Sequence, residues 1–189
     1  MKLADTPDLG SGVARRVGSS PILGNKEDWL FMKHSFEVGF SFGLTSAVIT
    51  TLGLMVGLSS GTHSQLAVIG GILTIALADS FSDALGIHIS EESENVHTHK
   101  EVWLSTFFTF ISKFIFTLIF AVPFLFFSLN TSIAVDIVWG LILLGVFSYF
   151  LAKKQKIKPW KVIAEHVFIA ILVIFLAHYL GEWIHSVCS

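Results

Sequence analysis

The chain has 189 residues, of which 53% are hydrophobic and 14% charged, and its mean hydropathy is +0.73. A typical soluble domain has about 25% charged residues, so this composition excludes that class and predicts an integral membrane protein. The net charge of −2 says little, because the placement of charges matters more than their sum, and no nucleic-acid partner is predicted. Cys188 is the single cysteine, which excludes an intrachain disulfide. Residues 1–30 lack the continuous apolar core of a signal peptide.

The predicted fold is all-α, with five transmembrane helices. Residues 1–33 are expected to form an arm, and residues 34–187 the membrane domain. Its apolar segments are 35–58, 65–89, 103–129, 131–151 and 160–184. Each is close to or above the ~20 residues that cross ~30 Å of hydrocarbon. They must be helices, because an open strand cannot satisfy its backbone hydrogen bonds in lipid.

Lysine and arginine residues predict the orientation of these helices. The 152–160 loop contains Lys153, Lys154, Lys156 and Lys158, and the arm contains Lys2, Arg15, Arg16, Lys26 and Lys33. The short hairpin loops after the first and third helices contain neither residue type. Because such residues concentrate on the cytoplasmic side, the N-terminus and the 91–102 and 152–160 loops are predicted to be cytoplasmic.

The second helix contains two acidic residues at membrane depth. Asp79 and Asp83 are four residues apart, which puts both carboxylates on one helix face, with Cβ atoms about 6 Å apart. An ionisable residue within a bilayer is costly and is treated as functional by default. Carboxylate oxygens suit hard cations such as Mn²⁺, so the pair is predicted to bind a metal within the membrane.

A simpler interpretation of the pair is structural. Lys113, on the third helix, is predicted to lie within about 5 Å of Asp83 in depth. An ion pair between them would neutralise both charges but would leave Asp79 unexplained. Thr45, Ser46 and Thr50 of the first helix could add neutral oxygens to a metal site, or their hydroxyls could bond to their own helix.

Acidic and histidine residues also gather after the second helix, between residues 88 and 99. This cluster could collect metal before it crosses the membrane, because imidazole suits Fe, Zn, Ni and Cu. The alternative is an ordinary solvated loop. Its members are His88, Glu91, Glu92, Glu94, His97 and His99.

The first helix is rich in small residues. Gly39, Gly43 and Ala47 form a stripe that allows close helix contact, either within one subunit or across a dimer. Glu37, Lys113, Glu165 and His166 are predicted to take part in proton coupling or in ion pairs.

The last two helices carry further polar residues. On the fifth helix, His178, Glu182 and His185 share one face and are predicted either to anchor the helix at the interface or to contact metal on the exit side. Asp136, near the outer end of the fourth helix, is expected to reach water.

Two segments resemble the vacuolar iron transporter family. Residues 43–58, GLTSAVITTLGLMVGL, are similar to its first helix, and residues 78–90, ADSFSDALGIHIS, to its second, with Ser82, Gly86 and Ser90 on matching positions. AVPFLFF around Pro123 and the final LAHYLGEWI resemble its third and fifth helices. The resemblance covers roughly residues 34–187 and implies divalent metal transport by a homodimer.

The chain departs from the family pattern at three points. The first-helix aspartate of the family falls on Ser46, and its second-helix methionine falls on Asp83. The long Glu-rich metal-binding insertion of characterised eukaryotic members is replaced by the loop EESENVHTHKEV. An acid has therefore moved from the first helix to the second.

Together these features predict a transporter that moves Fe²⁺ or Mn²⁺ out of the cytoplasm by proton exchange. The alternatives are a proton or ion conduit and a membrane subunit without transport. The predicted metal ligands are Asp79, Asp83, Thr45, Ser46, Thr50, His88, Glu91, Glu92 and Glu94. No permanently bound cofactor and no enzymatic activity are predicted. The expected location is the plasma membrane of a prokaryote or an organelle membrane.

Overall fold

The computed structural model describes residues 26–188, so most of the predicted arm, residues 1–25, lies outside the described part. The described chain is all-α. Its elements are α1 (Lys26–Thr62), α2 (Gln65–Ser93), α3 (His99–Ile119), the short 3-10 turn η1 (Pro123–Leu125), α4 (Leu129–Lys154) and α5 (Pro159–Cys188). All five α-helices are long and apolar enough to cross a membrane. The predicted multi-pass integral membrane protein with five membrane-length helices is confirmed.

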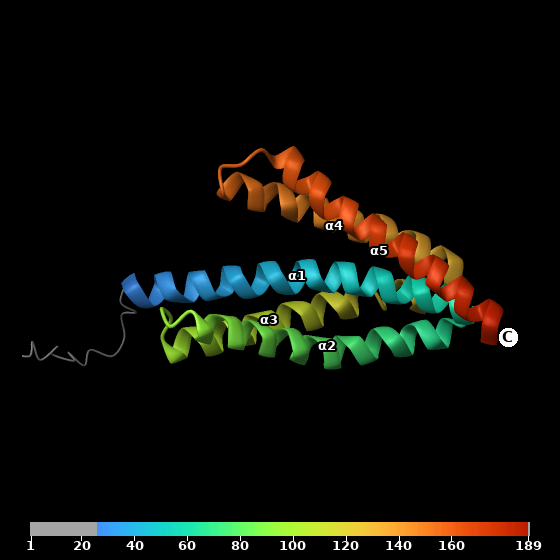
Figure 1. Ribbon diagram of the computed structural model, residues 1–189, viewed down its shortest axis with the longest axis horizontal. Coiled ribbons are helices and arrows are strands. Elements are labelled where there is room, and N and C mark those ends of the chain that lie inside the picture. Colours follow the sequence, from blue (N-terminus) through green and yellow to red (C-terminus); the bar gives the residue numbers. More distant parts are fainter. Residues whose placement is uncertain (1–25, 189) are drawn as a thin grey trace, which may run out of the picture.

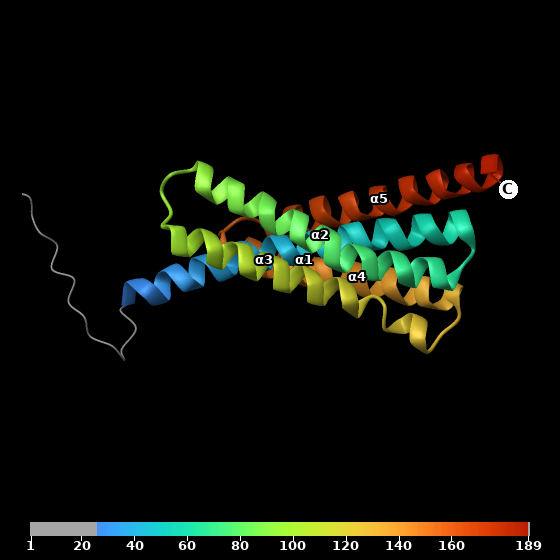
Figure 2. The same cartoon turned by 90° about the horizontal axis from the view of Figure 1, so that it is seen from below.

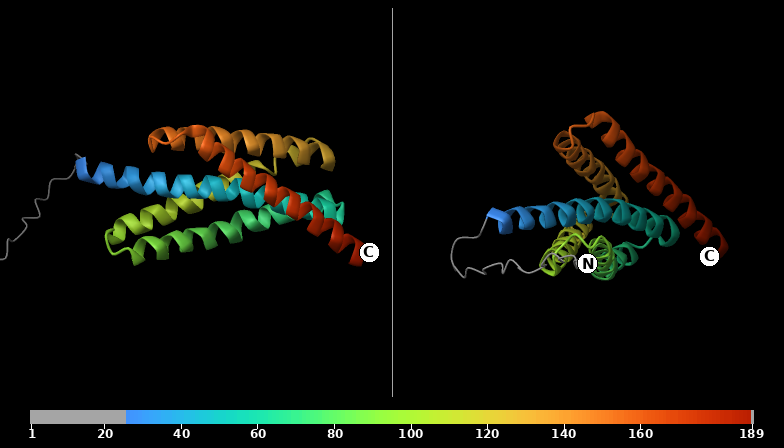
Figure 3. Two further views of the ribbon diagram at one scale, coloured as in Figure 1. Left: turned by 45° about the horizontal axis from the view of Figure 1, so that its top comes forward. Right: turned by 60° about the vertical axis from the view of Figure 1, so that its left-hand side comes forward.

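Helix α1 lies at the centre of the molecule. It packs against all four other α-helices, with the α2–α3 pair on one side and the α4–α5 pair on the other (Figure 1). The start of α1, the α2–α3 loop and the α4–α5 loop lie at one end of the bundle (Figure 2), which we call the lysine-rich end after Lys153 and Lys154. The α4–α5 pair diverges from α1 toward that end (Figure 3). The other end, where the C-terminus lies, we call the opposite end.

Two helix boundaries differ from the expected ones by more than a few residues. Helix α1 begins at Lys26 rather than near residue 35, so the last part of the predicted arm is helical. Helix α3 ends at Ile119 rather than near residue 129, and Pro123 opens the 3-10 turn that follows. Proline has no backbone N–H to donate to the Ile119 carbonyl, so the α-helical hydrogen-bond pattern cannot continue through Pro123.

Side-chain caps define the starts of α2 and α3. The Ser64 hydroxyl accepts a hydrogen bond from the Ala67 N–H at 3.3 Å and caps the start of α2. At the start of α3, Thr98 and Glu101 form a reciprocal capping box. Because α2 ends at Ser93 and α3 begins at His99, the expected absence of a large domain between them holds for this loop.

The glycines of α1 make close contacts within the subunit. A Cβ on Gly39 would lie 2.6 Å from the Thr109 backbone nitrogen, and one on Gly43 would lie 2.8 Å from the Thr109 carbonyl oxygen. One on Gly53 would lie 2.7 Å from Val173 of α5. The small-residue stripe therefore packs α1 against α3 within one subunit, which is one of the two predicted alternatives.

Candidate functional site

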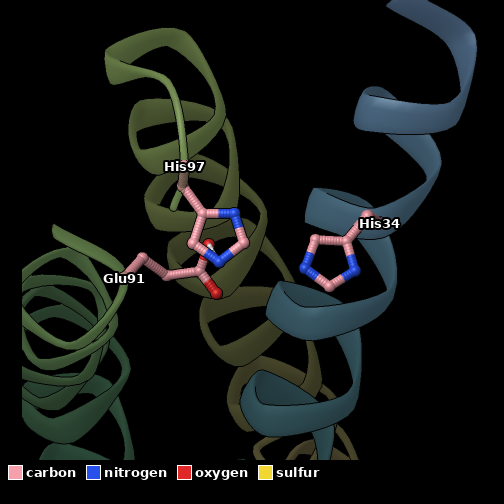
Figure 4. A group of neighbouring side chains, drawn as sticks. All are labelled: His34, Glu91 and His97. Atoms are coloured by element: carbon pink, nitrogen blue, oxygen red, sulfur yellow. Dashed lines mark ion pairs between the residues drawn. The ribbon is translucent and has the colours of Figure 1, made fainter. Parts of the chain in front are cut away.

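Three side chains with metal-binding atoms meet at the lysine-rich end. His34 comes from α1, Glu91 from the last turn of α2, and His97 from the loop before α3. One ligand atom of each lies within 4.8 Å of those of the other two. Figure 4 shows the His97 ring between the Glu91 carboxylate and the His34 ring. Residues far apart in the sequence thus form one group.

The spacing within this group is close to that of a metal site. The Nε2 atom of His97 lies 3.8 Å from Oε2 of Glu91. In a tetrahedral site with bonds of ~2.1 Å, neighbouring ligand atoms are ~3.4 Å apart. The rings of His34 and His97 are stacked, with centroids 5.5 Å apart. Because imidazole lone pairs lie in the ring plane, at least one of the two stacked rings would have to rotate before all three side chains could bind one ion.

Glu91 is held in place by its neighbours. Its side chain is buried, with only 7% exposed. Its Oε2 atom accepts a hydrogen bond from the Ser105 hydroxyl of α3 at 3.3 Å. Partners of this kind orient metal-binding carboxylates and raise affinity. A purely structural interpretation is that Glu91 pairs with His97 and closes the α2–α3 loop.

Helix stability does not account for the acids in this region. Glu91 and Glu92 lie in the last turn of α2 and Glu94 is its C-cap, with no basic residue in that turn. The carbonyl dipoles at a helix C-terminus disfavour negative charge there by about 0.3–1 kcal/mol for each acid. A cation bound among them would remove that cost.

The 88–99 cluster predicted from sequence divides into two parts. Glu94 lies with Glu91 and His97, and its Oε2 atom is 3.4 Å from Nε2 of His97. His88 faces α3 instead, where its Nδ1 lies 3.0 Å from the Thr106 hydroxyl and its Nε2 lies 4.0 Å from Glu92. His99 accepts a hydrogen bond from the Trp103 indole. The fold therefore separates His88, Glu92 and His99 from the group around Glu91.

The acids of α2 meet Lys113 of α3 in the bundle interior. Lys113 is fully buried, and its ammonium group contacts both carboxylates, at 2.5 Å for Asp79 Oδ2. It also donates to the Ser46 hydroxyl at 2.9 Å, and that hydroxyl donates to Asp83 at 2.6 Å. The predicted ion pair with Asp83 is present. It includes Asp79 as well, so the lysine accounts for both acids.

Only one of the three first-helix hydroxyls predicted as ligands joins this network. Ser46 bridges Lys113 and Asp83. Thr50 donates to the Ser46 carbonyl oxygen at 2.8 Å, which is the alternative predicted for it. Thr45 is half-buried on α1 and is not among the contacts of Lys113.

A buried polar stripe on α3 joins the two groups. Ser105, which contacts Glu91, is followed toward Lys113 by Thr109 and Ser112, and all are buried. Thr109 donates to the Ser105 carbonyl, and Ser112 donates to the Gly39 carbonyl at 3.0 Å. Packing alone would explain small side chains here, because α1 approaches closely. Their hydroxyls nevertheless make this face of α3 polar along the length between the two groups.

Of the four side chains predicted to take part in proton coupling or in ion pairs, Lys113 belongs to the group with Asp79 and Asp83, and the other three lie apart from both groups. Glu37 pairs with Lys154 of α4, His166 Nδ1 lies 2.8 Å from the Ser148 hydroxyl, and Glu165 is exposed on α5. At the opposite end, His178 Nδ1 lies 2.6 Å from the Ser60 hydroxyl. These contacts join α4 and α5 to each other and to α1.

Comparisons with known proteins add no family. No protein-family model matches the chain, and no curated protein matches it. The resemblance to vacuolar iron transporters therefore rests on the sequence motifs and on the five membrane-length helices. Of this His/Glu group, only Glu91 was among the predicted metal ligands; His97 was named in the 88–99 cluster but not as a ligand, and His34 was missed. The available signal was a histidine at the start of the first helix, on the same predicted membrane side as His97.

Proposed function

We propose that this protein transports a divalent transition metal, Fe²⁺ or Mn²⁺, out of the cytoplasm in exchange for protons. The observation that carries the proposal is the convergence of His34, Glu91 and His97 at the lysine-rich end. Positive-inside bias predicts that this end is cytoplasmic. The group would then be the first site that a cytoplasmic metal ion meets.

The ligand types favour a transition metal over calcium or magnesium. Imidazole nitrogen suits Fe, Zn, Ni and Cu, whereas Ca²⁺ and Mg²⁺ prefer sites built only from oxygen. Glu91 adds one oxygen, and the exposed Glu94 can add another. Two nitrogens and one or two carboxylates therefore fit Fe²⁺ well and Mn²⁺ adequately.

The Asp79, Asp83 and Lys113 group is the proposed intramembrane site. Asp83 lies eight residues before Glu91 on α2 (91 − 83 = 8), which is ~12 Å along the helix axis. The Lys113 ammonium would hold the two carboxylates when metal is absent, and an arriving divalent ion would compete with it for the same oxygens. The Ser105, Thr109 and Ser112 stripe would line the way between the two sites.

The proposal is tested first by metal binding to purified protein. Equilibrium dialysis with Fe²⁺, Mn²⁺, Co²⁺, Zn²⁺ and Ca²⁺ should show binding of transition metals and little binding of Ca²⁺. His34→Ala, Glu91→Gln and His97→Ala should each weaken binding by at least about tenfold, since each removes a ligand or its charge. His99→Ala is the matched control and should leave affinity unchanged. Equal affinity in all four variants would contradict the site.

A proton or ion conduit without metal specificity is the second candidate. Contact between Lys113 and both carboxylates favours it, because no free anionic pair is left for a metal. Proteoliposomes loaded with a pH indicator separate the two functions. Metal uptake with a matching pH change supports the transporter, whereas proton flux that ignores added metal supports the conduit.

A further inference from the structure

One buried acid takes no part in the contacts described above. Asp136 lies on α4, seven residues after Leu129 (136 − 129 = 7), or about 10 Å along the axis from the opposite end. Its side chain is 1% exposed. Neither of its carboxylate oxygens has a hydrogen-bond partner within residues 26–188. The expectation that Asp136 reaches water is therefore wrong.

The fold provides no counter-charge for Asp136. Helix α4 packs against α1, α5 and the η1 turn. In the half of the bundle around Asp136, residues 52–62 of α1 and 117–127 of α3 and η1 contain no ionisable side chain, and neither do residues 65–78 of α2. On α5, His178 bonds to Ser60 and the other ionisable side chains are exposed. Those others are Tyr179, Glu182, His185 and Cys188.

A carboxylate in this position must be neutralised. An ionised group that is buried without a partner is strongly unfavourable, and more so in a membrane. A divalent metal needs about four ligands, and Asp136 alone provides too few. Packing is tight on the side of Gly140, one turn along α4, where a Cβ would lie 3.0 Å from Leu52 and 3.2 Å from Phe120. A proton needs neither further ligands nor space.

Three buried hydroxyls lie at depths along the bundle between those of Asp136 and the Lys113 group. Thr51 of α1, Ser80 of α2 and Thr117 of α3 have no hydrogen-bond partner in the described chain. They lie about 5–8 Å along the helices from Ser46, Asp83 and Lys113 respectively, on the side toward the opposite end. A hydroxyl can accept one proton while donating another, so unpaired hydroxyls at this depth suit proton transfer.

We propose that Asp136 is the proton-binding carboxyl of the transport route, and that it receives from the opposite side of the membrane the proton exchanged for metal. The inference rests on the proposed function. The carboxylate gains one proton from water at the opposite end and later releases it toward Thr51, Ser80 and Thr117, so no other reactant is needed. Ser132, buried one turn nearer that end, lies on the way in.

Infrared spectroscopy of the purified protein tests proton binding without transport. The wild type should show the C=O band of a protonated carboxylic acid near neutral pH. Asp136→Asn should lose that band, and Ser132→Ala, the matched control on the same buried stripe, should keep it. Because Asn is neutral and similar in size to the protonated acid, Asp136→Asn should melt at about the same temperature as the wild type. A wild type without the band, or an Asp136→Asn variant that keeps it, would overturn the assignment.

Proteoliposome assays test the coupling. Asp136→Asn should still bind metal at the His34 group with wild-type affinity, but should lose the pH change that accompanies metal uptake. A variant that moves as many protons per metal as the wild type would overturn the inference and leave the transporter intact. A wild type without metal flux would instead reject the proposed function, and the infrared result would then decide proton binding on its own.

Discussion

A lysine with no exposure to solvent needs anionic partners, and Lys113 has two. Its ammonium group contacts Asp79 and Asp83 and donates to Ser46. Removing one partner of a buried ion pair costs about 3–5 kcal/mol, because the other charge stays buried and unpaired. Here either acid can remain when the other is lost. The cost of a single substitution should therefore be smaller than the cost of a double one.

We predict that Asp79→Asn/Asp83→Asn lowers the free energy of unfolding by about 3 kcal/mol or more, and that each single variant loses less. Adding Lys113→Met should restore most of the lost stability, because the unpaired charge is then gone. Melting temperatures in detergent measure these effects. A double variant as stable as the wild type would mean that the lysine does not depend on these carboxylates.

The transport role of the same residues is tested separately from stability. If the stable Asp79→Asn/Asp83→Asn/Lys113→Met variant still takes up metal, the metal route lies elsewhere. If this variant loses metal uptake while its melting temperature is restored, the result supports Asp79 and Asp83 as metal ligands.

At the scale of helices, glycine decides how closely α1 and α3 approach. A Cβ on Gly43 would meet backbone atoms of α3, including the Lys113 nitrogen at 3.0 Å. Backbone cannot move aside as a flexible side chain can. The contact between these helices also holds Ser46 within reach of Lys113. Helix packing and the charged group are therefore linked.

We expect Gly43→Ala to lower the free energy of unfolding by about 1–3 kcal/mol, the usual cost of overpacking. Gly86→Ala on α2 is the matched control, because a Cβ there would meet nothing within 4 Å. It should be neutral or gain up to ~1 kcal/mol from better helix propensity. Equal effects of the two substitutions on the melting temperature would argue against the described α1–α3 contact.

At the scale of the whole molecule, the arrangement of five helices restricts both assembly and orientation. Helix α1 contacts all four other α-helices, and its Gly39 and Gly43 face α3. The homodimer stays a prediction, but this stripe is not available to form its interface. An odd number of membrane-length helices puts the lysine-rich end and the C-terminus on opposite sides.

The predicted orientation can be checked with one native and one introduced cysteine. Cys188 is exposed at the opposite end. An impermeant maleimide added to intact cells or sealed right-side-out vesicles should label Cys188. It should not label Lys154→Cys in a Cys188→Ser background until the membrane is opened. The reverse pattern would place the lysine-rich end outside and would reverse the proposed transport direction.

The sequence alone determined the membrane class, the number of helices and much of the intramembrane group. Hydropathy predicts the five helices because only long apolar segments with internal backbone hydrogen bonds are stable in lipid. Charge at membrane depth identified Asp79, Asp83 and Lys113, because a lone ionised group there is costly.

Only the tertiary structure decided which side chains meet. His34 lies 57 residues from Glu91 (91 − 34 = 57) and joins it through the packing of α1 beside α2 and α3. Asp136 is close to the end of its helix in the sequence, yet the neighbouring helices and the η1 turn bury it. Burial depends on what packs around a residue, and the pattern of one helix does not contain that information.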